Sequence, residues 1–166
     1  MADEKPIGVD NPGFQVLKDA VLTLLNQYPD LNGQVITYSG LTEDSGISME
    51  PESGALVYSK QTDILGGIHQ RCQFPFFIVK RGATTDEYQK FTVSEFLDTL
   101  GAWLCREPVT IKNSEYRLTE YPELTGGRRI TDIERSNSYP LEPNKNKTQD
   151  WVIRVNVNYT HDFVKP

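Results

Sequence analysis

Apolar residues recur with a helical period in the first part of the chain. From Phe14 to Tyr28 they fall at every third or fourth position, so that one face of a helix would be apolar. Asn11 is a favourable N-cap and Pro12 is tolerated at the first helical position, whereas Pro29 cannot continue the pattern. The sequence therefore predicts a helix that starts at Asn11-Pro12 and ends before Pro29.

A second helical stripe runs from Val93 to Arg106. Thr92 and Glu95 have the spacing of a capping box, in which each residue satisfies a backbone donor of the other. Trp103 lies on the apolar side of the stripe, and Glu107-Pro108 ends it. We expect a helix over this range, with its apolar side packed against a sheet.

Two further segments alternate between apolar and polar positions, as strands do. The even-numbered residues from Cys72 to Ile78 are apolar, and so are the odd-numbered residues from Trp151 to Tyr159. Pro75 lies inside the first segment and cannot donate to a ladder of hydrogen bonds. We therefore expect this strand, over residues 69–81, to lie locally at an edge or to carry a bulge.

Shorter strands and turns complete the pattern. Strands are predicted at 34–38, 47–49, 55–58 and 129–135, with the second and third paired as a hairpin. Residues 1–10 are polar and predict a loose, flexible N-terminal arm. Long loops are expected at 39–54 and 108–127, and loops of that length often belong to an interface.

These elements predict one α+β domain over residues 11–166. Its architecture is an antiparallel β-sheet with two α-helices packed on one face, together with a β-hairpin and long loops. The helical stripes and the apolar strand faces would form the core. The other face of the sheet carries polar residues and would meet water or another subunit; they are Gln70, Gln73, Asn156 and Asn158.

Composition fits a soluble domain of this kind. The 166 residues are 37% hydrophobic and 24% charged, and no apolar run approaches the roughly 18 residues that span a bilayer. The first residues lack the pattern of a secretory signal, so we expect synthesis in the cytoplasm, without a membrane.

Charge bears on the choice of partner. A net charge of −6 argues against a general nucleic-acid binder. Two basic pairs stand out, Lys80-Arg81 and Arg128-Arg129. They are either solvated strand ends or contacts with an acidic partner surface.

Groups that could carry out chemistry are sparse. His69 and His161 lie at strand ends, and a neighbouring His161-Asp162 pair would point to opposite faces of a strand. Cys72 and Cys105 are expected to be small core residues, because a structural zinc site needs four ligands. The acidic pair Glu43-Asp44 is expected to be solvated. We predict no catalytic residue, no cofactor and no metal site.

The order of segments resembles the tail-terminator and minor-capsid proteins of long-tailed bacteriophages. Four pieces, over about two thirds of the chain, carry the resemblance: the acidic hairpin 44–58, the block 71–76, the helix 93–106 with Trp103, and the close formed by 130–134 and 151–159. The first eleven residues and the loop 108–127 have no counterpart in that family.

The resemblance implies a structural virion protein and not an enzyme. Such proteins form a homo-oligomeric ring, usually of six copies, at the head-proximal end of the tail. The ring ends polymerisation of the tail-tube protein and offers a surface to the head-completion or connector protein, while DNA passes through as cargo. A closed ring needs two different, matching patches on each subunit. The candidate interface residues are Arg71, Pro75, Lys80, Arg81, Arg128, Arg129, Arg154 and Asn156.

Two alternatives remain at this point. The chain is another head–tail joining or minor-capsid component of the same kind, or a small α+β enzyme or ligand-binding domain with its site on the polar sheet face. A ring in solution favours the first class, and a monomer with a deep pocket favours the second.

Overall fold

The structure is a computed structural model that describes residues 4–42, 45–83 and 87–165. The residues Met1–Asp3, Glu43 and Asp44 therefore lie outside the described part, although the sequence analysis refers to them. The described elements are β1 (Gly8–Val9), α1 (Asn11–Leu25), β2 (Ile36–Tyr38), β3 (Gly46–Pro51), β4 (Leu56–Thr62), β5 (Gly67–Ala83), α2 (Glu87–Leu104), β6 (Val109–Ile111), β7 (Ser114–Tyr116), β8 (Arg128–Arg135), β9 (Tyr139–Pro140) and β10 (Thr148–Val164).

Two long strands form the middle of the sheet. β5 and β10 have 17 residues each and pair antiparallel over their whole length, from Thr148 opposite Ala83 to Val164 opposite Gly67. β8 continues the sheet beyond β10, and β3 and β4 continue it beyond β5. Only the short β2–β3 pair is parallel within the described residues. The predicted α+β class with a mostly antiparallel sheet is confirmed.

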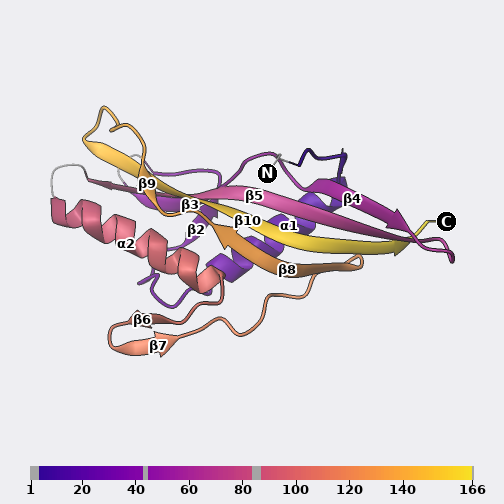
Figure 1. The fold of residues 1–166 in the computed structure, drawn as a ribbon. Coiled ribbons are helices and arrows are strands. Elements are labelled where there is room, and N and C mark those ends of the chain that lie inside the picture. The colour runs from indigo at the N-terminus through magenta and orange to yellow at the C-terminus, as the bar shows by residue number, and fades with distance from the viewer. Residues whose placement is uncertain (1–3, 43–44, 84–86, 166) are drawn as a thin grey trace.

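Both helices cover the same side of this sheet (Figure 1). The predicted apolar stripes are the buried ones, because α1 buries Leu17, Val21, Leu24 and Leu25, and α2 buries Val93, Leu97, Leu100, Trp103 and Leu104. They pack on the even-numbered residues of β5 from Cys72 to Ile78 and on the odd-numbered residues of β10 from Ile153 to Tyr159. The alternation read from the sequence therefore identifies the core face of both strands.

Both helix starts differ from the prediction. Asp10, and not Asn11, caps α1, since its Oδ1 accepts a hydrogen bond from the backbone N–H of Gly13 at 3.2 Å. The capping box at Thr92 is wrong, because α2 already includes Glu87 and the Thr92 hydroxyl donates to the carbonyl of Tyr88, one turn earlier. The aromatic residues at the start of α2, Tyr88 and Phe91, are exposed and lie off the buried stripe, so the stripe alone places the helix start too late.

The predicted hairpin between 47–49 and 55–58 is also wrong. β3 and β4 do not pair with each other; they follow one another along the same edge of β5, opposite residues 76–81 and 68–73 respectively. Hairpins form instead between β4 and β5, across Asp63–Gly66, between β6 and β7 within the predicted loop 108–127, and between β9 and β10. A 17-residue strand is long enough to pair with two short ones in series, which no local pattern reveals.

Pro75 lies at the gap between β3 and β4. Its carbonyl accepts a hydrogen bond from the backbone N–H of Glu52 at 3.2 Å, so its nitrogen also points towards this gap. The missing N–H therefore costs no ladder bond with β10. The expectation that β5 lies locally at an edge around Pro75 is confirmed.

The predicted loose arm is instead held to the sheet where it is described. Gly8 and Val9 pair with β4, Glu4 bonds to Arg71, and Asp10 is buried at 5% exposure. Long-range partners thus order a polar segment that has no periodic pattern of its own.

Candidate assembly surface

The side of the sheet opposite the helices is called the open face here. Within the described residues no helix covers it. Six of the eight predicted interface residues lie on it: Arg71, Pro75 and Arg81 from β5, Arg154 and Asn156 from β10, and Arg129 from β8. Gln73, Asn156 and Asn158 are also on this face, but Gln70 is not, because it has the same alternation as Cys72.

Ion pairs cross the open face. Arg81 forms a two-pronged contact with Asp150, with N···O distances of 2.7 and 3.0 Å. Arg154 reaches Glu52 at 2.9 Å, and Arg71 reaches Glu4 at 2.7 Å. The last two pairs are exposed, so each contributes at most about 1 kcal/mol to the folded state. Such pairs can be exchanged for contacts with another protein at little cost.

Two polar groups on the open face have no partner within the described residues. The side chain of Arg129 is exposed and makes no hydrogen bond or ion pair there. The side-chain oxygen Oδ1 of Asn156 is buried and accepts no hydrogen bond. Asn156 also lines a hollow of about 230 Å³ together with Glu134, Ser136 and Arg154. An unsatisfied acceptor in a hollow is a group that a donor from a partner would satisfy.

The other two predicted interface residues lie on the helix side. Lys80 places its Nζ 4.5 Å from the ring centroid of Phe96 and donates to Gln34 at 3.2 Å. Burial lowers the pKa of Lys80 below its ordinary value of 10.5. Neither Lys80 nor Arg128 therefore belongs to the open face.

Arg128 belongs to a buried polar network instead. Its Nε and Nη2 donate to the two carboxylate oxygens of Asp10 at 2.8 and 2.7 Å, and the Tyr159 hydroxyl donates to Asp10 at 2.8 Å. Burial raises the pKa of Asp10, but the hydrogen bonds from Arg128 and Tyr159 outweigh it, so the pKa lies below 3.8. Burial and the bond to Asp10 raise the pKa of Tyr159. The network ties the start of α1 to β8 and β10.

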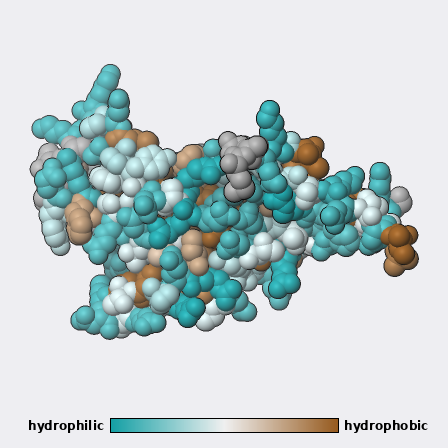
Figure 2. Space-filling view, in the orientation of Figure 1, coloured by the Kyte–Doolittle hydropathy of each residue, from teal (hydrophilic) through white to brown (hydrophobic). Residues whose placement is uncertain are grey.

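The turn between β4 and β5 is the most exposed apolar point that the structure describes. We call residues 63–66 the hairpin tip. Ile64 is 100% exposed and Leu65 is 87% exposed. In Figure 2 an apolar group stands at the end of the molecule where Figure 1 places this turn. The sequence analysis missed it, although an Ile-Leu pair between Asp and Gly-Gly was the available signal.

Side-chain hydrogen bonds stabilise the hairpin tip. Asp63 Oδ1 accepts the backbone N–H groups of Leu65 and Gly67, at 2.9 and 2.8 Å. His69 lies between two carboxylates, with Nε2 3.0 Å from Asp63 and Nδ1 2.9 Å from Asp162. The hydrogen bonds to Asp63 and Asp162 raise the pKa of His69 above 6.5.

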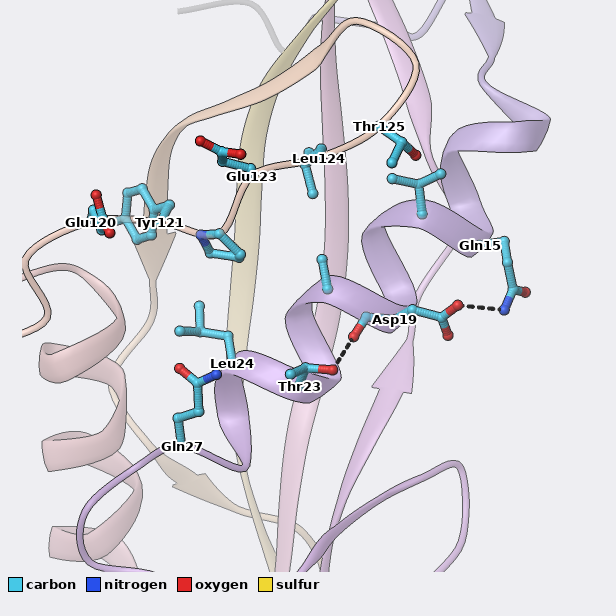
Figure 3. A pocket seen from close by; sticks show the side chains of 13 residues that line it. Gln15, Asp19, Thr23, Leu24, Gln27, Glu120, Tyr121, Glu123, Leu124 and Thr125 are labelled. Carbon is cyan, nitrogen blue, oxygen red and sulfur yellow. Dashed lines mark hydrogen bonds between the residues drawn. The ribbon is translucent and has the colours of Figure 1, made fainter.

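A groove lies on the helix side, between α1 and the segment 120–125 (Figure 3). Its volume is about 700 Å³. Apolar atoms of Val16, Ala20, Leu24 and Leu124 line it, and the carboxylates of Asp19, Glu120 and Glu123 stand on its rim. Sequence reasoning identified 108–127 as a candidate interface loop without locating the groove.

Other sites from the sequence analysis can be placed. Cys72 is buried as expected, and burial raises its pKa to about 11; Cys105 is half-buried. Among the described residues, no group of three His, Cys, Asp or Glu side chains is placed to hold a metal ion. In that same part of the chain, no helix is both long and apolar enough to cross a membrane.

The sequence matches no protein-family model and no curated protein.

Proposed function

We propose that this chain is a structural, non-enzymatic subunit of a bacteriophage tail-terminator ring. In this role several copies close into a ring at the head-proximal end of the tail tube. The ring stops growth of the tube and offers a surface to the head-completion or connector protein. DNA passes through the ring as cargo.

The observation that carries the proposal is the open face. It gathers six residues that the sequence analysis selected for contacts between proteins, and it includes an unpaired Arg129 and the unsatisfied oxygen of Asn156. The rim of a protein interface is polar and carries hydrogen bonds, which a sheet face of mixed charge can supply. The kind of assembly that we propose, a ring at the end of a tail tube, is taken from the resemblance in the order of segments.

Ring closure imposes a second requirement. Neighbours in a ring meet through two different patches, and neither patch is self-complementary. The open face and the helix side are different surfaces of this chain, and both carry features suited to contact. A twofold dimer through one face alone would not support a ring.

The test is the mass of the purified chain in solution, alone and with preassembled tail tubes. We expect a ring-sized species, favoured by tube ends, and tubes of defined length when the chain is present during polymerisation. Tubes that grow equally long with and without the chain would contradict the terminator role.

The same experiment separates the related alternatives. A ring that binds the connector protein but ignores tube ends would indicate another head–tail component. A chain that stays monomeric under all these conditions would reject ring assembly and favour a ligand-binding domain.

A further inference from the structure

The hairpin tip carries residue types that are unusual in an exposed turn. Turn corners exposed to water generally carry Asn, Asp, Ser, Gly or Pro. Here Ile64 and Leu65 occupy the two corners and are 100% and 87% exposed. Gly66, with φ of +84°, completes the turn. The turn therefore forms in spite of two side chains that water solvates poorly.

The hairpin tip is held in a defined shape. Asp63 accepts two backbone N–H groups of the turn, and His69 joins Asp63 to Asp162 on β10. A braced turn loses little conformational entropy when it binds, because its geometry is already fixed. The tip is thus a preformed apolar knob and not a slack loop.

The knob cannot reach the groove of its own chain. In Figure 1 the β4–β5 turn projects past the helices, at the end of the sheet where the C-terminal strand also ends. The groove between α1 and 120–125 lies on the helix side, in the body of the molecule. An occupant of the groove that carries this tip must come from a second copy.

Charge around the two surfaces is complementary. Lys60 and Lys165 flank the tip, are exposed, and have no partner among the residues that the structure describes, whereas Asp63 and Asp162 at the same end are both bonded to His69. On the groove rim, Glu120 and Glu123 likewise lack a partner within the described chain, and Asp19 lies 3.5 Å from Lys18. Free lysines would thus face free carboxylates.

We propose that the hairpin tip of one copy inserts into the groove between α1 and residues 120–125 of the next copy. Ile64 and Leu65 fill the apolar floor formed by Val16, Ala20 and Leu24, and Lys60 and Lys165 face Glu120 and Glu123. The contact joins two different patches, which is the arrangement that closes a ring. This inference rests on the proposed ring assembly and specifies one of its contacts.

The first test replaces the apolar knob. The variant Ile64→Asn/Leu65→Asn keeps residues that suit a turn, and its melting temperature should equal that of the wild type. Its self-association, measured by sedimentation over a concentration series, should weaken at least tenfold. Val35→Asn removes an apolar side chain that is 67% exposed elsewhere, and it should associate like the wild type.

The second test reverses charge on each side of the contact. Lys60→Glu/Lys165→Glu and Glu120→Lys/Glu123→Lys should each weaken association at least tenfold, because like charges then meet. A chain that carries all four changes should associate nearly as strongly as the wild type. Rescue of this kind requires that the two surfaces meet across copies.

The outcomes separate this contact from the ring itself. Wild-type rings that persist in the knob variant, or failure of the fourfold variant to recover, overturn the tip–groove contact and leave the proposed ring standing. Equal weakening by Val35→Asn also overturns it, because the effect then follows from any lost apolar surface. A wild type that never associates overturns both.

Discussion

At the scale of single residues, Arg128 and its neighbour Arg129 show that two residues of the same type can have different roles. Arg128 and Arg129 form one basic pair in the sequence, yet the side chain of Arg128 is 5% exposed and bound to Asp10, and Arg129 is exposed on the open face. Charge reversal at Arg128 therefore tests the stability of the fold, whereas charge reversal at Arg129 tests assembly. Only Arg129 can report on assembly without loss of the fold.

Arg128→Met is expected to lower the free energy of unfolding by about 3–5 kcal/mol, because it leaves the carboxylate of Asp10 buried without its cation. Arg129→Met, the matched control, should change it by no more than about 0.5 kcal/mol. Urea denaturation of both variants measures the difference. Equal effects of the two substitutions would contradict the buried ion pair.

The His69 bridge predicts a dependence on pH. The pKa of His69 is raised above 6.5 in the folded protein, first by the hydrogen bond to Asp63 and then by that to Asp162. The stabilisation is therefore fully present below pH 6.5 and disappears as the pH rises through the raised folded value. The stability difference between the wild type and His69→Gln should shrink over that window.

Measuring this difference, and not stability alone, removes the contribution of His161. Burial lowers the pKa of His161, so its contribution has the opposite sign and falls away as the pH drops. Thermal melts of the wild type and His69→Gln at a series of pH values provide the comparison. A difference that stays constant from well below to well above pH 6.5 would contradict the bridge.

At the scale of elements, the apolar stripe of α2, and not its termini, determines how the helix packs on the sheet. Trp103 is 5% exposed and packs edge-on against Tyr28, with ring centroids 5.4 Å apart. Phe91 lies on the same helix and is 65% exposed. One aromatic residue of α2 is thus buried and the other is exposed, so substituting each of them distinguishes the effect of burial from the effect of lying in the helix.

Trp103→Ala should lower the free energy of unfolding by about 3–5 kcal/mol through the lost burial and the cavity that remains. Phe91→Ala should leave it within about 0.5 kcal/mol of the wild type. Guanidinium denaturation of the two variants measures the difference in their free energies of unfolding. A wild-type melting transition in Trp103→Ala would refute the packing of α2 on the sheet.

At the scale of the whole molecule, a layer of helices covers one side of the sheet, and no described helix covers the other side. Arg129→Glu is expected to preserve the melting temperature and to prevent ring assembly, since it reverses an unpaired charge on the open face. Arg117→Glu reverses an exposed arginine between β7 and β8 and serves as the control. Intact rings of Arg129→Glu would exclude this part of the face from the interface.

The sequence predicts much of this fold and less of the surface. Periodicity identifies the buried stripes of α1 and α2, because a period of 3.6 or 2 is a local property of the chain. It also predicts a local edge or a bulge at Pro75, since a missing donor restricts where a strand can pair, and the structure shows the edge. It places Arg128 wrongly, because no local pattern states which of two neighbouring arginines finds a buried carboxylate.

The sequence by itself determined the α+β class, the two helical stripes and the faces of the two long strands, because local spacing decides which side chains can share a surface. Only the tertiary structure decided that β3 and β4 lie in series along β5, and that Asp10 meets Arg128 across 118 residues of chain. It also decided that the hairpin tip and the groove lie apart. Such contacts depend on how distant segments pack, and sequence spacing does not encode those distances.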